Sequence, residues 1–295
     1  LSKFNMKGNS LMLTIIIALL PVMGWGLMPI VANLKKSSPH EQLLGTSISA
    51  FIFSTIITLV IHPEITFFSF CISMISGIFW SLGQLMQFKA IQIASVSKVM
   101  PISNGSQLTF TTLLAVILFN EWTSSKMLLI GSLSILCIIL GILLTNYQTK
   151  KSTDKNMLKC VGVVLLSSLF LSLYVVTNQI FLIEGYRIIL PQSVGMLITS
   201  SIIVKYFSKE IVYRENVLFN LITGILWSIA NLGMFITTNT LGVTISFSIS
   251  QSCVIVATLG GIIFFKEKKN KKEWLAIFIG IILIMSGVFM LSIIK

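Results

Sequence analysis

The sequence predicts an all-α integral membrane protein with ten transmembrane helices in two inverted five-helix repeats. Hydrophobic residues make up 55% of the chain and charged residues only 10%, and the mean hydropathy is +0.96. A soluble globular domain carries about 25% charged residues, so this composition excludes one. Long apolar runs recur along the chain, and one sixteen-residue phrase occurs twice. The runs predict the helices, and the repeated phrase predicts the two halves.

Each apolar run is long enough to cross the hydrocarbon core of a bilayer, which takes about 20 residues in a helix. The expected spans, in order, are Leu11–Ala32, Leu43–Ile61, Phe67–Phe88, Val99–Leu118, Met127–Thr145, Val161–Ile183, Ile188–Phe207, Leu218–Thr238, Val243–Phe265 and Trp274–Ile294. The first span lacks the small-x-small cleavage pattern of a signal peptide and contains Trp25. We therefore expect a retained helix and, in what remains of the chain, no separate soluble domain.

Several functional classes find no support in the residues. His40 and His62 lie a whole helix apart and cannot share a metal, and the chain has no G-x-x-x-x-G-K-[ST] motif for ATP hydrolysis. We expect no cofactor, no metal and no enzymatic activity. The formal charge of +12 indicates topology in a membrane protein rather than a nucleic-acid partner. The cysteines have no C-x-x-C spacing and are expected to be small core residues: Cys71, Cys137, Cys160 and Cys253.

With ten spans the loops alternate between two faces, and the cations divide unequally between them. The face with both termini carries five cations: Lys3, Lys7, Lys126, Arg187 and Lys295. The other face carries the remaining sixteen of the 21. The positive-inside rule therefore predicts that the cation-rich loops are cytoplasmic and that both termini are outside. Lys3 and Lys7 count against this orientation, which also depends on the number of spans.

The phrase SGIFWSLGQLMQFKAI, residues 76–91, recurs as TGILWSIANLGMFITT, residues 223–238. Six of the sixteen positions are identical, among them Trp80/Trp227, at an offset of 147 residues. The longest polar connection lies between the fifth and sixth spans. We therefore predict a first repeat over residues 1–147, a cytoplasmic central linker over 148–158 and a second repeat over 159–295. Because five is odd, the halves enter the membrane from opposite faces, which predicts alternating access around a site between them.

The repeated phrase places aromatic rings and uncharged amides on one face of a helix. Trp80, Gln84 and Phe88 lie four residues apart, and Trp227 and Asn231 repeat the pattern in the second copy. Rings stack on the C–H faces of a sugar and amides bond its hydroxyls, so this chemistry suits a sugar. The competing interpretation is structural, because a lone amide in a membrane helix more often bonds a neighbouring helix, and a Trp is often an interfacial anchor.

Further amides and hydroxyls cluster in PISNGSQ (residues 101–107), SISQS (248–252) and TNQ (177–179). In hydrocarbon these groups must face a partner or a water-filled cavity. The residue pattern therefore predicts a substrate-binding set made up of Trp80, Gln84, Phe88, Asn104, Gln107, Asn178, Trp227, Asn231 and Gln251.

Six phrases are similar to the motifs of one known family and follow its order. They are GWGLMPIVANLK (24–35), GIFWSLGQLMQFKAIQIASVSKVMPISNGSQL (77–108), FNEW (119–122), LPQSVGM (190–196), SFSISQ (246–251) and TLGGIIFFKEKK (258–269). The chain thereby resembles the glucose/ribose porter family of the drug/metabolite transporter superfamily. The resemblance implies ten helices, a bacterial plasma-membrane location and uptake of glucose or a similar monosaccharide with protons. It adds Trp25 and Gln87 to the substrate-binding set.

Two features depart from what the resemblance implies. Asn104 stands where the family has a Thr, which bears either on substrate choice or on local packing. Many members of the superfamily keep both termini in the cytoplasm, whereas the cation count here places them outside.

Proton coupling requires a group that is exposed to each side of the membrane in turn, usually a carboxylate or a histidine. The nine acidic residues of this chain all lie in loops or near the ends of spans. Glu121 and Glu267 are the proton-coupling candidates, because each follows the fourth span of its half. Both have lysines nearby, so a salt-bridged helix end is the favoured alternative.

Other functional classes stay open. The chain could export a small neutral metabolite, or it could be a membrane sensor. An exporter of organic cations should carry a carboxylate within a span, and a sensor should carry a soluble domain; the residues predict neither. The partners that the sequence predicts are a sugar, the lipid bilayer and protons as coupling ion. It does not distinguish glucose from ribose, uptake from export, or a monomer from a homo-oligomer.

Overall fold

The computed structural model describes residues 2–119, 122–149, 155–209, 211–241 and 243–293, and its regular structure there is entirely helical. The helices are α1 (Ser2–Leu34), α2 (Pro39–Ile61), α3 (Phe67–Ile93), α4 (Val96–Phe119), α5 (Ser125–Thr145), α6 (Lys155–Ile180), α7 (Tyr186–Phe207), α8 (Arg214–Phe219), α9 (Leu221–Leu241), α10 (Val243–Ser250), α11 (Cys253–Phe264) and α12 (Lys271–Ser292). This confirms the predicted all-α membrane fold.

Nine stretches of the described chain are long and apolar enough to cross a membrane, against ten predicted. The short helix α8 and helix α9 together supply one of them, over Arg214–Thr238. The difference lies in the predicted ninth span, which forms two shorter helices, α10 and α11, separated at Gln251 and Ser252. At this break the Ser250 hydroxyl donates to the Phe247 carbonyl over 2.7 Å. The main-chain N–H groups of Ser252 and Ile255 bond carbonyls three residues back instead of four, which marks a short 3₁₀-like turn between the two helices.

Side-chain caps fix where several helices begin. Ser38 accepts a hydrogen bond from the Glu41 N–H, and Glu41 accepts one from the Ser38 N–H, which forms a capping box at the start of α2. Asn270 and Glu273 form the same reciprocal pair at the start of α12. These caps satisfy N–H groups that the first helical turn leaves without partners.

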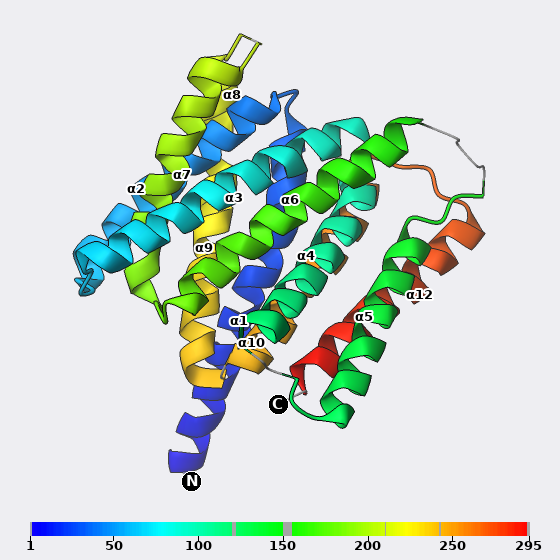
Figure 1. The fold of residues 1–295 in the computed structure, drawn as a ribbon, viewed down its shortest axis with the longest axis horizontal. Helices are drawn as coiled ribbons and strands as arrows, with labels where there is room; N and C mark the ends of the chain where they lie inside the picture. Colours follow the sequence, from blue (N-terminus) through cyan, green and yellow to red (C-terminus); the bar gives the residue numbers. More distant parts are fainter. Residues whose placement is uncertain (1, 120–121, 150–154, 210, 242, 294–295) are drawn as a thin grey trace.

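Helices from the two halves of the sequence pack against each other (Figure 1). Helix α3 packs against α6 and α7, whereas α9 packs against α1 and α2, and α5 pairs with α12. Each third helix of a predicted half therefore lies against the first two helices of the other half. An inverted repeat would produce this exchange, and the repeat itself stays a prediction.

Two repeat-related glycines permit these close contacts. A Cβ atom on Gly77 of α3 would lie 2.0 Å from the Gln192 carbonyl oxygen of α7. A Cβ atom on Gly224 of α9 would lie 2.2 Å from the Thr46 carbonyl oxygen of α2. Only glycine fits at either place, as small-xxx-small packing of membrane helices requires.

The loops gather at two ends of the molecule. The loops from α1 to α2, from α3 to α4, from α7 to α8 and from α11 to α12 lie toward the upper end of Figure 1, and both termini lie toward the lower end. We call the upper end the cation-rich end, because its described loops, residues 35–38, 94–95, 208–209, 211–213 and 265–270, belong to the face with sixteen cations. Apolar side chains cover the outward surfaces between the ends, among them Leu129, Leu143 and Leu275.

Candidate functional site

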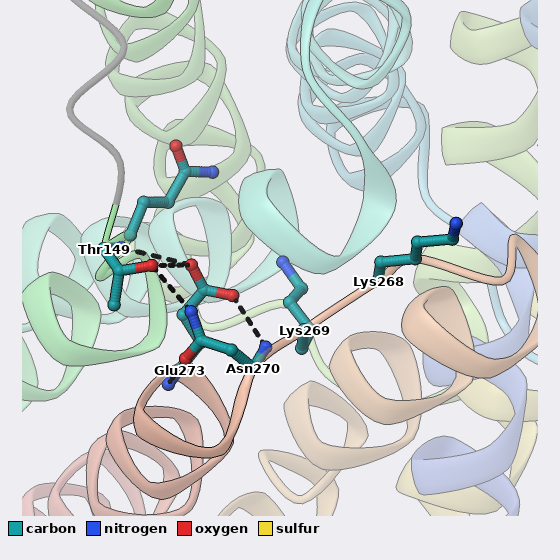
Figure 2. A pocket seen from close by; sticks show the side chains of 6 residues that line it. Thr149, Lys268, Lys269, Asn270 and Glu273 are labelled. Carbon is teal, nitrogen blue, oxygen red and sulfur yellow. Dashed lines mark hydrogen bonds between the residues drawn. The ribbon is translucent and has the colours of Figure 1, made fainter.

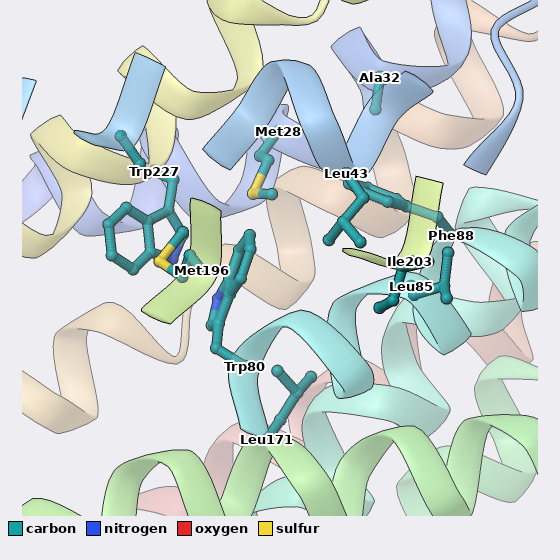
Figure 3. Packing of buried hydrophobic residues seen from close by; sticks show 11 residues of the cluster. Met28, Ala32, Leu43, Trp80, Leu85, Phe88, Leu171, Met196, Ile203 and Trp227 are labelled. Atoms are coloured by element: carbon teal, nitrogen blue, oxygen red, sulfur yellow. The ribbon is translucent and has the colours of Figure 1, made fainter. Parts of the chain in front are cut away.

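Trp80 and Trp227, the aromatic pair of the repeated phrase, meet in a buried core cluster (Figure 3). Their ring centroids are 5.4 Å apart and the rings lie at 63° in an edge-to-face contact. Trp80 is 2% exposed and Trp227 is 3% exposed. Gly77 places α3 against α7, and Gly224 places α9 against α2, so the two rings reach each other from helices that each pack on other neighbours. In this conformation the pair is closed to solvent.

A continuous apolar cluster surrounds the tryptophan pair (Figure 3). Met28 and Met196 lie beside the rings, and Trp25 packs against the cluster from α1. Phe88 belongs to the same cluster but lies near its other end, beside Leu43 and Ile203. The structure therefore places the four predicted aromatic residues in or against one cluster, with Phe88 apart from the tryptophans. Phe88 is fully buried at a distance from the tryptophan pair, which favours a packing role for it.

The predicted glutamines form a buried hydrogen-bonded chain beside this cluster. Gln84 Nε2 donates to Gln87 Oε1 over 2.8 Å, and Gln87 Nε2 donates to Ser103 Oγ over 2.7 Å. The Ser168 hydroxyl in turn donates to the Ser103 carbonyl over 3.1 Å. The chain links α3 to α4 and α6. Because the amides bond each other, the closed core avoids the cost of buried polar groups without partners.

Asn231, the counterpart of Gln84 in the second phrase, has a different partner. Its Nδ2 donates to the Trp227 carbonyl over 2.8 Å, and its Oδ1 accepts from the Tyr174 hydroxyl at 3.4 Å. Tyr174 lies on α6, packs against the tryptophan cluster and was not predicted as a site residue. One signal in the sequence could have identified it: Tyr174 precedes Asn178 by four residues and therefore shares its helix face.

Asn178 lies in a separate polar network and not at the tryptophan pair. Ser73 Oγ donates to Asn178 Oδ1 over 2.8 Å, and Asn178 Nδ2 donates to Ser76 Oγ over 3.0 Å. Gln192 Nε2 also donates to Ser76 Oγ, over 2.8 Å. These bonds join α3, α6 and α7, which favours the structural interpretation of Asn178.

The remaining predicted amides lie along α4 and the broken helix. Asn104 Nδ2 approaches Cys253 Sγ at 3.5 Å and connects α4 to the first residue of α11. Gln251, which lies 147 residues further on, stands in the break between α10 and α11. Gln107 is half-buried, and its main-chain oxygen accepts a bond of 2.9 Å from Ser172 Oγ. Asn104 and Gln251 are therefore associated with the irregular backbone of α10–α11.

Of the two proton-coupling candidates, only Glu267 lies within the described residues. Glu121 lies outside the described residues. Glu267 forms an ion pair with Lys269 at 3.1 Å and accepts hydrogen bonds of 2.7 and 2.6 Å from Ser97 Oγ. The salt-bridged alternative is therefore observed for Glu267, although its partner is Lys269 rather than the adjacent Lys266 or Lys268.

An open pocket of about 460 Å³ lies at the cation-rich end (Figure 2). The Thr149 N–H and hydroxyl both donate to Glu273 Oε1 over 3.1 Å, and Asn270 Nδ2 donates to Thr149 Oγ1 over 2.6 Å. These bonds tie the residues after α5 to the start of α12. The other residues that line the pocket are Gln148, Lys268 and Lys269. None of the predicted substrate-binding residues lines it.

The fold and this core define a polytopic helical membrane protein in which two repeat-related helices meet through buried aromatic and amide side chains. The chain belongs to the sugar transport protein family, whose model matches residues 16–294. It is a multi-pass protein of the plasma membrane, and its relatives described below are bacterial.

Two curated relatives span nearly the whole chain. A Listeria monocytogenes protein, lmo0424, whose name assigns it to sugar uptake, is 55% identical over 282 residues, which cover 95% of this chain and 99% of its own. The glucose uptake protein GlcU of Bacillus subtilis is 38% identical over 286 residues, which cover 95% of this chain and 98% of its own. One crystal structure matches with a TM-score of 0.63 and covers 96% of this chain and 99% of its own. Its 13% identity shows a common fold only.

Proposed function

We propose that this protein is a secondary transporter, and not an enzyme, that takes up glucose or a similar monosaccharide across the bacterial plasma membrane. The observation that carries the proposal is the contact between Trp80 and Trp227, flanked by Gln84 and Asn231. Rings and uncharged amides together match the C–H faces and hydroxyls of a sugar. The name of the Bacillus subtilis relative, a glucose uptake protein, supports the same substrate class.

The proposed mechanism is alternating access between residues 1–147 and 159–295, with residues 148–158 as the linker. Trp80 and Trp227 come from different halves and close the path between them. A sugar entering from one side separates the rings and lies between them. Opening then passes to the other side through relative movement of the halves, as in other transporters built from inverted repeats.

The amide network suggests how a sugar is bound without leaving polar groups unpaired. In the closed core Gln84 bonds Gln87, and Asn231 bonds Tyr174. A sugar hydroxyl both donates and accepts, so it replaces either bond with an equivalent one. This exchange matters because a buried polar group without a partner costs about 1–3 kcal/mol. Apolar analogues of the same size would lack that replacement and would bind weakly.

We propose protons as the coupling ion on the family resemblance. The ion pair between Glu267 and Lys269 offers this carboxylate a fixed structural partner, which favours Glu121 as the carrier. The choice between Glu121 and Glu267 as proton carrier concerns only the energy source of uptake and leaves the proposed sugar site unchanged.

The proposal is tested by uptake of labelled sugars in a bacterial strain that lacks its own sugar permeases. Expression of the protein should give saturable accumulation of glucose, competed by a subset of monosaccharides. A strain that carries the empty vector is the control. Efflux alone, across a panel of sugars and neutral metabolites, would contradict the uptake function and support an exporter.

A further inference from the structure

Glu41 is a fully buried carboxylate at the cation-rich end, in the first turn of α2. Its side chain is 1% exposed. Oε2 accepts a hydrogen bond from the Ser38 N–H over 2.7 Å, within the cap of α2 itself. Oε1 accepts from the Tyr213 N–H over 2.6 Å, and Oε2 also accepts from Asn216 Nδ2 over 2.9 Å. One carboxylate therefore bonds its own helix and the start of α8, which belongs to the other predicted half.

These contacts stabilise a charge where burial would otherwise be expensive. Among the described residues the ion pairs do not include Glu41, so its negative charge is balanced by N–H donors and not by a lysine or arginine. Hydrogen bonds from N–H groups to a carboxylate are short and strong in such an environment. The carboxylate would lose two of its three donors if α2 and α8 separated, and it would then require water.

Other polar contacts join the halves at the same end. Asn220 Nδ2 donates to Ser37 Oγ over 3.0 Å, and Ser97 bonds Glu267 as described above. At the opposite end, the ion pair between Arg187 and Glu64 spans 3.9 Å, with side chains that are 57% and 92% exposed. Exposed pairs of this kind contribute little. Toward that opposite end the buried bonds of Asn178 with Ser73 and Ser76 also join the halves. What distinguishes the cation-rich end is that one of its inter-half contacts is made by a buried carboxylate, that of Glu41.

We infer that Glu41 is a latch residue that holds the cation-rich end closed and releases when that end opens during transport. The inference rests on the proposed alternating access. It assigns this structure to the conformation that is closed at the cation-rich end. Opening replaces the Tyr213 and Asn216 donors by water, while the Ser38 N–H moves with α2 and stays bonded. The carboxylate thus has partners in both states, as a two-state element requires.

Glu41→Gln tests the latch while it preserves the cap of α2. A glutamine at this position still accepts the Ser38 N–H, because Glu and Gln serve equally in a capping box. Its NH₂ group then faces the Tyr213 N–H, donor against donor, so the Tyr213 bond across the halves is lost while the glutamine oxygen still accepts from Asn216. Asn216→Ala removes a second donor without any change in α2. The matched controls are Glu215→Gln, an exposed acid on α8, and Glu64→Gln at the opposite end.

The readout is the rate at which a cysteine at Thr46 reacts with a water-soluble maleimide. Thr46 is fully buried between α2 and α9, beside Thr223 and more than one turn from Glu41. The four native cysteines are first replaced by alanine, and the protein is held in nanodiscs, which expose both faces. Loss of a charged hydrogen bond should raise the labelling rate about tenfold in Glu41→Gln and less in Asn216→Ala. Both controls should label at the parent rate.

Transport of sugar is measured on the same variants to separate the latch from the proposed function. If Glu41→Gln and Asn216→Ala both label at the parent rate while the parent transports sugar, the latch is wrong and the proposed function stands. If labelling rises but the parent transports no sugar, the latch stands and the proposed function fails. A general loss of folding would raise labelling together with a lower unfolding temperature, whereas the latch predicts faster labelling in Asn216→Ala at an unchanged unfolding temperature.

Discussion

At the residue scale, the core combines two features that are rarely compatible, which are complete burial and many polar side chains. Gln84, Gln87 and Ser103 achieve this because each amide or hydroxyl finds its partner on the next residue of the chain of bonds. These side chains satisfy one another's hydrogen bonds only while the core is closed. In the proposed mechanism, a substrate that separates α3 from α9 would expose these groups and would have to supply their hydrogen bonds itself. The proposal therefore predicts that hydroxyl groups are recognised.

Substitution of the paired amides should therefore weaken sugar binding. In Gln84→Leu and Asn231→Leu a sugar hydroxyl is left unpaired at the site, at about 1–3 kcal/mol, or roughly 5- to 150-fold in affinity. Membrane insertion should be largely intact, because leucine suits a membrane helix. The measurement is the KM of uptake together with the amount of folded protein.

Gln179→Leu is the matched control for this test, because Gln179 is an exposed amide on α6 outside the core. Its sugar affinity should equal that of the parent. Parental affinity in both Gln84→Leu and Asn231→Leu would assign these amides to contacts between helices and would remove them from the site.

At the element scale, the sequence predicts individual helices better than their partners. The offset of 147 residues identified Trp80 and Trp227 as related positions, and the structure places them in contact. Tyr174 was missed because its partner, Asn231, lies on α9, and the only local signal for it was the helix face that it shares with Asn178. The break between α10 and α11 was missed because hydropathy registers an uninterrupted apolar run there, whereas the backbone at Gln251 and Ser252 leaves the regular α-helical bonding pattern.

The close approach of the helices gives a stability prediction. Gly77→Ala and Gly224→Ala should each lower stability by about 1–3 kcal/mol, because the added methyl group would overlap a carbonyl oxygen of α7 or α2. The measurement is the thermal unfolding of purified protein in detergent.

Gly162→Ala is the control, since an added Cβ there meets nothing within 4 Å. Alanine has the higher helix propensity, so this variant should be neutral or more stable by up to about 1 kcal/mol. Equal stability of Gly77→Ala and Gly162→Ala would mean that α3 and α7 do not approach as closely as the structure describes.

At the scale of the whole molecule, the unequal distribution of cations predicts the orientation in the membrane. Lys268 lies exposed at the cation-rich end, and Glu64 lies exposed at the opposite end. With the native cysteines removed, Lys268→Cys in intact cells should react only with membrane-permeant maleimides. Glu64→Cys should react with impermeant ones as well. The reverse pattern would place both termini in the cytoplasm, as in many members of the superfamily.

Energy coupling belongs to the complete transport cycle, because a coupled proton must be taken up on one side and released on the other. Glu267 is held by Lys269 and Ser97 in the closed conformation, so a structural role explains its position without any proton transfer. Glu267→Gln should therefore spare uphill accumulation in whatever protein remains folded.

A protonophore should abolish accumulation in the unmutated protein and spare the exchange of labelled for unlabelled sugar, since exchange needs no energy source. Glu121→Gln should reproduce the effect of the protonophore if that residue carries the proton. If accumulation survives the protonophore, another ion must supply the driving force. If the unmutated protein shows no uphill accumulation at all, it acts by facilitated diffusion.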